Sequence, residues 1–168
     1  MLYLLKVFLD ICLLRAGPQD LPASHFLMWL ALALHALLGV VFALFTLPLG
    51  QALLAAATGT ALLLLAIQIA LTITYKPERR IQTVTALAGS ELLLGLLALL
   101  PTVWFYSVDG AQARLLPSLL SLLFIVWGVV VTGHILRHAL AISQAFALML
   151  ALAYTLFSYS LMGTLFPY

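Results

Sequence analysis

Five long apolar stretches, separated by short polar turns, dominate this chain of 168 residues. A helix that crosses a bilayer needs about 20 consecutive apolar residues, because each residue adds only about 1.5 Å of rise. Only 7% of the residues are charged, whereas soluble domains carry about 25%. The sequence therefore predicts an all-α, multi-pass membrane bundle over residues 22–166. Its transmembrane helices are expected at about 24–46, 51–74, 81–105, 115–136 and 140–165.

Turn-forming residues separate these stretches. Ser24 is placed to cap the first span, and residues 47–50, LPLG, turn the chain back into the second. Pro77 separates the second span from the third, because proline removes a backbone donor and disfavours helix at the residue before it. Pro117 is expected in the first turn of the fourth span, where the ring is tolerated. These signals predict helices that run back and forth across the bilayer.

Residues 1–16 predict an amphipathic helix rather than a further span. At about 100° per residue, Tyr3, Lys6 and Asp10 share one narrow polar stripe within an otherwise apolar segment. The segment lacks the basic cluster and the small-residue cleavage site of a signal peptide. We expect a helix that lies in the membrane interface or caps the bundle. Cys12 is the only cysteine, which excludes an internal disulfide; we expect it to pack as an apolar residue, with a reactive thiol as the alternative.

Basic residues are distributed unevenly between the two sides of the predicted bundle. Arg114 alone falls on the side away from the N-terminus. The others fall on the N-terminal side: Lys6, Arg15, Lys76, Arg79, Arg80 and Arg137. Short loops rich in Lys and Arg stay in the cytoplasm. The sequence therefore predicts a cytoplasmic N-terminus and a C-terminus on the opposite side of the membrane.

Glu91 is the most unusual residue of the predicted spans. It has no charged residue within ten positions on either side and stands near the middle of its span. An ionised carboxylate at the bilayer centre costs roughly 2.5–3.5 kcal/mol, so we expect Glu91 to face the bundle interior. His35 lies at a similar depth and is a candidate hydrogen-bond partner, as are Gln68, Thr85 and Ser90.

Two interpretations of this intramembrane polar site remain open. Glu91 and His35 form either a hydrogen bond that fixes helix packing or a proton or cation site. A conduit usually needs several ionisable groups along a path, and the sequence offers one pair, which favours the packing interpretation. Small residues in the second and third spans, such as Ala56, Gly89 and Gly95, are expected to pack the spans against neighbours within the chain.

A second polar cluster lies at the cytoplasmic end of the fourth span. His134, Arg137 and His138 share one helical face, at positions i, i+3 and i+4. With Arg79 and Arg80 they are expected to form a cationic group that contacts anionic lipid head groups. Two histidines four residues apart can bind a metal, but no Asp, Glu or Cys lies nearby in sequence. We therefore expect no metal and no other cofactor.

Two stretches resemble bacterial Yip1-domain membrane proteins. They are RRIQTVTALAGSELLLGLLALLP, residues 79–101, and VWGVVVTGHILRHAL, residues 126–140. The likeness covers most of residues 22–166 and includes the five-span plan with a cytoplasmic N-terminus. The resemblance implies a location in the bacterial inner (cytoplasmic) membrane, with a periplasmic C-terminus. In eukaryotic members the family implies contacts with small GTPases through a long cytoplasmic tail. Here about 23 residues precede the first span, and GPQDLP replaces the family's DLYGP pattern, which argues against GTPase binding.

The expected function is that of a non-enzymatic scaffold, assembly factor or accessory subunit. The sequence has no nucleophile with a base, phosphate loop, paired catalytic carboxylates or basic patch suited to nucleic acid. The expected partners are membrane lipids and other membrane proteins, or further copies of this chain. The alternative is a small conduit for protons, ions or lipids centred on Glu91 and His35.

Overall fold

The computed structural model describes residues 2–167, and this part of the chain is helical throughout apart from its turns. Five of its helices are long and apolar enough to cross a membrane, which confirms the predicted all-α, multi-pass membrane protein. In chain order the elements are α1 (Leu2–Cys12), η1 (Pro18–Asp20), α2 (His25–Ala43), α3 (Leu49–Ile73), η2 (Pro77–Arg79), α4 (Arg80–Ser107), α5 (Ala111–Leu140) and α6 (Gln144–Leu165).

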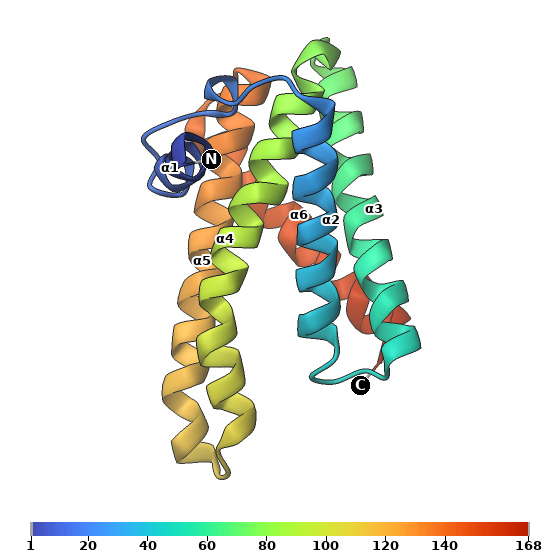
Figure 1. The fold of residues 1–168 in the computed structure, drawn as a ribbon, viewed down its shortest axis with the longest axis vertical. Coiled ribbons are helices and arrows are strands. Elements are labelled where there is room, and N and C mark those ends of the chain that lie inside the picture. Colours follow the sequence, from blue (N-terminus) through green and yellow to red (C-terminus); the bar gives the residue numbers. More distant parts are fainter. Residues whose placement is uncertain (1, 168) are drawn as a thin grey trace.

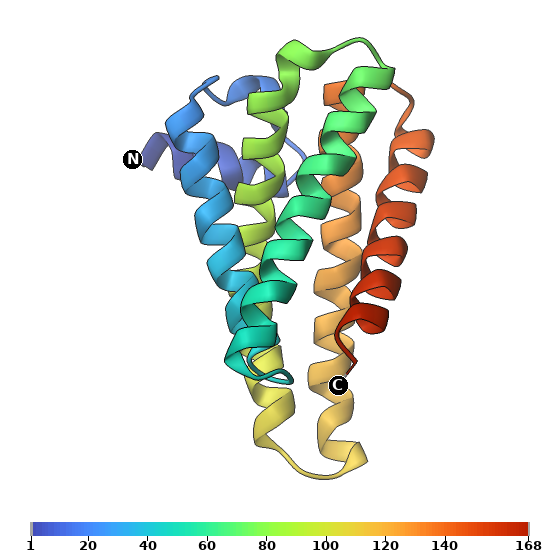
Figure 2. The ribbon, with the colours of Figure 1, turned by 90° about the vertical axis from the view of Figure 1, so that its right-hand side faces the viewer.

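The five long helices form an incompletely closed ring (Figures 1 and 2). Helix α4 packs on both α2 and α5. On the outer sides of this central trio, α3 packs on α2 and α6 packs on α5. Between α3 and α6, where the ring would close, the contacts are sparse. The α4–α5 hairpin extends beyond the turn that joins α2 to α3 (Figure 1). The bundle therefore has one compact end and one end where only the hairpin projects.

Most helix boundaries follow local signals. The Ser24 side chain caps α2 by accepting a hydrogen bond from the Leu27 N–H at 3.3 Å, as predicted. The expectation that Pro117 lies in the first turn of its helix is wrong, because α5 already begins at Ala111. Gly110 makes the preceding turn with φ of 93°, a conformation that favours glycine, and so lets the helix start earlier. Pro117 is therefore an interior proline, which membrane helices tolerate.

The hydrophobic core occupies only one half of the bundle. Residues 83–90 of α4 are all buried, and so are residues 131–136 of α5. The rest of this core comes mainly from α2, α3 and α6, with Leu32, Leu63 and Ala151 as examples. Between Glu91 and the end of the bundle where the α4–α5 hairpin projects, few described residues are buried: Leu38, Leu47, Ala52, Pro101 and Pro117. We call the first part the core half and the second part the open half.

Helix α1 lies across the outer side of α4 and α5 (Figures 1 and 2). Phe8 occupies the space left by Gly89, Ile11 is fully buried, and the Trp127 Nε1–H donates to the Cys12 carbonyl at 3.1 Å. Because Gly89 lies nine residues into α4, this contact is about 14 Å along the helix from Arg80. Helix α1 therefore lies against the side of the bundle and does not cap its end.

The end of the N-terminal helix also differs from prediction. The helix ends at Cys12 rather than near residue 16, because the chain turns at Leu14, which has φ of 61°. The predicted start at Met1 lies outside the described residues. Outside the polar stripe, Leu5 and Leu9 of α1 and Leu13 just after it are exposed apolar residues.

Small residues bring the spans close together within the chain, as the sequence predicts. A Cβ atom on Gly95 of α4 would lie 2.6 Å from Leu38 Cδ2 of α2. A Cβ atom on Gly39 of α2 would lie 3.4 Å from Ala56 Cβ of α3, an ordinary van der Waals contact. These contacts let α2 lie close to both α4 and α3, which places the middle of α2 against the middle of α4.

Candidate functional site

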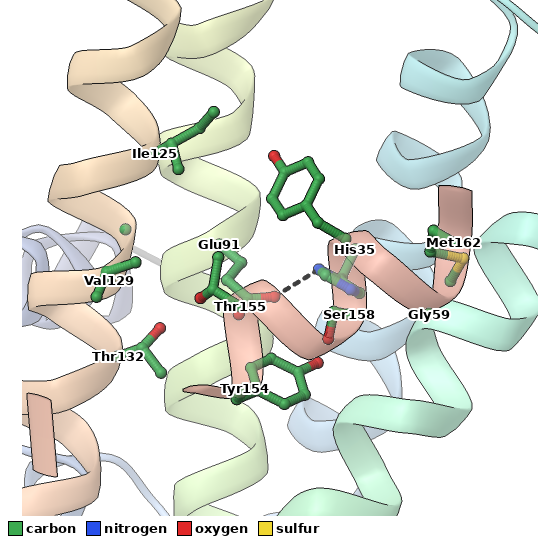
Figure 3. Close-up of a pocket in the computed structure, with 12 residues that line it drawn as sticks. His35, Gly59, Glu91, Ile125, Val129, Thr132, Tyr154, Thr155, Ser158 and Met162 are labelled. Carbon is green, nitrogen blue, oxygen red and sulfur yellow. Dashed lines mark ion pairs between the residues drawn. The ribbon is translucent and has the colours of Figure 1, made fainter. Parts of the chain in front are cut away.

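Glu91 and His35 meet at the centre of the molecule. His35 Nδ1 lies 3.4 Å from Glu91 Oε2, which joins α2 to α4 (Figure 3). His35 follows Ser24, the N-cap of α2, by eleven residues, and Glu91 follows Arg80, the first residue of α4, by eleven. The two side chains are therefore at matched depth. Their side chains keep 22% and 29% of their surface accessible, because both line an open cavity between the helices.

This central cavity has a volume of about 430 Å³ and is lined by residues of all five spans (Figure 3). Helices α2 and α4 contribute the His35–Glu91 pair, and α3 contributes Gly59. The remaining polar lining comes from α5 and α6: Thr132, Tyr154, Thr155, Ser158 and Tyr159. The remaining apolar lining consists of Ile125, Gly128, Val129 and Met162.

Two further cavities adjoin the central one in the open half. The first, of about 340 Å³, shares His35 and continues between α2, α3 and α6 to Thr46 and Phe166. The second, of about 350 Å³, shares Glu91 and continues between α2, α4 and α5 to Thr102. The polar pair therefore lies where the run of buried core residues ends and the cavities of the open half begin.

The core half contains a different kind of cavity. It measures about 320 Å³ and is lined by apolar side chains of α3, α4, α5 and α6, with Leu63, Leu87 and Phe157 as examples. Thr132 and Tyr154 line both this cavity and the central one. These two side chains therefore separate the polar centre from the apolar core.

The contribution of α6 to the site was not predicted from the sequence. Tyr154, Thr155, Ser158 and Tyr159 recur at i, i+1, i+4 and i+5, which places them on one face of an otherwise apolar span. This polar stripe is visible in the sequence and indicates a helix face turned toward other polar groups. It is the signal that could have added α6 to the predicted site.

Gln68 does not belong to the intramembrane polar site. Its Oε1 accepts a hydrogen bond from Arg80 Nη1 at 3.0 Å, and its Nε2 donates to Thr72 Oγ1 at 3.3 Å. Sequence reasoning took Gln68 as a candidate partner of Glu91. In the structure the Gln68 side chain lies on the outer face of α3 and is exposed. Thr85 is also occupied elsewhere, since its hydroxyl donates to the Ile81 carbonyl at 2.7 Å.

The predicted cationic group lies at the start of α4 and the end of α5. Two of its members do not face the surrounding lipid: Arg79 binds backbone carbonyls, and His134 is buried. Arg79 Nη1 donates to the carbonyls of His138 and Ala139, at 3.0 and 3.1 Å. Lys76 Nζ donates to the Leu140 carbonyl at 2.6 Å. Because the last carbonyls of a helix lack intrahelical donors, these two cations cap α5.

His134 is buried and does not present its ring to lipid head groups. Its Nε2–H donates to the Ala16 carbonyl at 2.9 Å, which ties the segment between α1 and η1 to α5. The His138 ring stands edge-on to it, with 4.7 Å between centroids. Arg137 is exposed and donates to Gln144 Oε1 at 3.4 Å. Arg80, Arg137 and part of His138 therefore remain as the surface of this group.

Within residues 2–167, no three His, Cys, Asp or Glu side chains gather as a metal site would require. No family model and no curated protein matches the sequence, and no solved structure matches the fold. The five apolar spans define a multi-pass membrane protein, and among the described residues its interior carries one acid–imidazole pair.

Proposed function

We propose that this chain is a non-enzymatic accessory or scaffold subunit of the bacterial inner membrane. The observation that carries the proposal is the contrast between its two halves. The core half holds the hydrophobic core, whereas the open half contains adjoining cavities and few buried residues. The contact between α3 and α6 is also sparse. Protein interiors are normally packed as densely as organic crystals. A partner membrane helix or lipid seated on the open half would supply the missing contacts.

The cellular location and orientation belong to the same proposal. Lys76, Arg79, Arg80 and Arg137 lie at one end of the bundle, and Arg114 lies in the hairpin at the other. This distribution supports a cytoplasmic face at the core half, because Lys and Arg accumulate in cytoplasmic loops. The five-span plan is also consistent with the resemblance to bacterial Yip1-domain proteins, which we retain as a proposed relationship.

A conduit for protons, ions or lipids is the second candidate. It is favoured by the position of the Glu91–His35 pair at the inner end of the cavities of the open half. On the other side of the pair, the cavity of the core half is lined almost entirely by apolar side chains and borders the buried hydrophobic core, which offers no continuation of a polar path. We therefore rank an accessory role above a conduit.

Purification from the native membrane in mild detergent, with mass determination and protein identification, tests the accessory role. We expect a second membrane protein at fixed stoichiometry. A lone monomer or homo-oligomer would overturn the accessory role.

Photo-crosslinking from α6 tests whether the partner contacts the open half. Met149 and Ser160 are both exposed, and because they are eleven residues apart they share a helix face. A photoreactive residue at Ser160 should crosslink the copurifying protein, while the same residue at Met149 should not. Crosslinking from Met149 alone would place the partner on the core half and contradict the proposed surface.

A further inference from the structure

The central cavity has one acidic and one basic side chain among its described lining residues. Glu91 is the acid and His35 is the base. Around them the lining is neutral and includes the two phenol side chains Tyr154 and Tyr159 and the thioether of Met162. Aromatic faces attract organic cations within about 6 Å, by about 0.5–2 kcal/mol. The lining therefore offers one carboxylate and polarisable groups, which suits a cation better than an anion.

Charge balance at this depth points the same way. A net charge at the bilayer centre is costly, and the His35–Glu91 pair is neutral overall when it holds one titratable proton. An anion entering the cavity would find only His35 as a positive partner, and Glu91 lies 3.4 Å from that ring. A cation entering the cavity leaves the site neutral if the pair releases its proton.

We propose that this cavity binds an organic ammonium-type cation carried on an apolar body, with Glu91 as counter-ion and one proton released for each cation bound. The volume of about 430 Å³ falls within the usual range of small-molecule sites, about 300–1,000 Å³. The adjoining cavities of the open half give room for the apolar body. The same head-group chemistry occurs in a free lipophilic amine and in an aminolipid.

The proton release involves a small set of groups. His35 on α2 and the phenols of Tyr154 and Tyr159 on α6 are the titratable groups that line the cavity with Glu91. The lining residues of α3 and α5 are Gly59, Ile125, Gly128, Val129 and Thr132, none of which titrates. Exchange of one proton for one cation predicts an affinity that rises about tenfold per pH unit while the pair is protonated. The apolar body would occupy part of the open half that the proposed partner covers. The cation site itself is formed by this chain alone, so the ligand proposal and the accessory role can each fail separately.

Equilibrium dialysis of radiolabelled tetraphenylphosphonium against the full-length protein in dodecyl maltoside tests the proposal. We expect one cation bound per chain, tighter binding as the pH rises between about 6 and 8, and release of one proton into weakly buffered solution. Glu91→Gln should abolish binding, whereas Glu78→Gln, at an exposed carboxylate of η2, should leave it unchanged. Glu91→Asp should retain measurable binding, which separates loss of the carboxylate from loss of the fold.

Competition distinguishes the possible sources of the cation. Octylamine and octanol have the same apolar chain and differ in charge, so octylamine alone should displace the probe. Displacement by phosphatidylethanolamine in mixed micelles would identify an aminolipid as the source, and its failure would identify a free amine. Displacement by octanol as effective as that by octylamine, binding independent of pH, undiminished binding to the Glu91→Gln variant, or no binding to the wild-type protein would each overturn the proposal.

Discussion

At the scale of single residues, the contact between Glu91 and His35 could be predicted from the sequence. Matched depth could be counted from the span boundaries, because each helical residue advances by a fixed rise. Gln68 shows the limit of that reasoning, since depth does not say which way a side chain faces. The side chain of Gln68 points outward and bonds Arg80, and only the packing of α3 decides this.

The strength of the His35–Glu91 contact can be measured with a double-mutant cycle. Glu91→Gln, His35→Asn and the double variant should give a coupling free energy of about 0.6 kcal/mol, with an upper limit near 1.7 kcal/mol, because membrane hydrogen bonds contribute little net energy. Unfolding in mixed detergent micelles provides the measurement. If the loss of unfolding free energy in the double variant equals the sum of the losses in the two single variants, the pair does not stabilise the bundle.

The Cys12 thiol is expected to react slowly. Burial raises the pKa of this thiol, and its Sγ lies 3.9 Å from the Ser90 carbonyl. Because the thiolate is the reactive form, a raised pKa lowers its fraction at any pH below that value. N-ethylmaleimide should therefore label Cys12 much more slowly than a cysteine at exposed Asp109, introduced as Asp109→Cys with Cys12→Ala. Equal labelling rates in the folded proteins would contradict the burial of Cys12.

At the scale of elements, the spans could be predicted because length and hydropathy are local properties of the sequence. Helix starts were harder to place, as the interior position of Pro117 shows. The burial of His134 could not be predicted, because it depends on a distant segment that folds back and places the Ala16 carbonyl beside the ring. The cavities arise from how five helices meet, and no single stretch of sequence encodes them.

Two glycines of α5 provide a matched test of helix packing. A Cβ on Gly133 would lie 2.7 Å from Leu148 Cδ2 and 3.1 Å from Leu148 Cα, so α6 itself would have to move. Gly133→Ala should therefore destabilise the protein by about 1–3 kcal/mol. A Cβ on Gly128 would have no atom of a neighbouring element within 4 Å, and Gly128→Ala should leave stability unchanged or raise it by up to about 1 kcal/mol. Equal effects of the two substitutions in detergent unfolding would contradict the close α5–α6 contact.

Neighbouring arginines test the cap of α5. Arg79 donates to two carbonyls at the end of α5, whereas Arg80 bonds an exposed glutamine side chain. Arg79→Met should lower the free energy of unfolding by about 1–2 kcal/mol, because charged donors to helix-end carbonyls are lost. Arg80→Met should change it by less than about 0.5 kcal/mol. The reverse order in detergent unfolding would show that the contacts of Arg79 do not stabilise the helix end.

At the scale of the whole molecule, each end of the bundle carries a carboxylate that can be replaced by cysteine, so the proposed orientation in the membrane can be measured by labelling. Glu78 lies in η2 at one end, and Asp109 lies in the turn of the α4–α5 hairpin at the other. In a Cys12→Ala background, a membrane-impermeant maleimide applied to spheroplasts should label Asp109→Cys. It should label Glu78→Cys only after lysis. The opposite pattern would reverse the orientation derived from the Lys and Arg distribution.

The projecting α4–α5 hairpin has a consequence for the surrounding lipid. At about 1.5 Å per residue, the 28 residues of α4 and the 30 of α5 are about 42 and 45 Å long, whereas the 19 of α2 are about 29 Å long. The hydrocarbon layer is about 30 Å thick, so α2 matches it and the hairpin exceeds it. Leu100, Leu115 and Leu119 on the hairpin are exposed, so this excess carries apolar surface. A bilayer around this protein therefore has to thicken beside the hairpin or tilt it, and membrane thickness becomes a variable that selects where the protein resides.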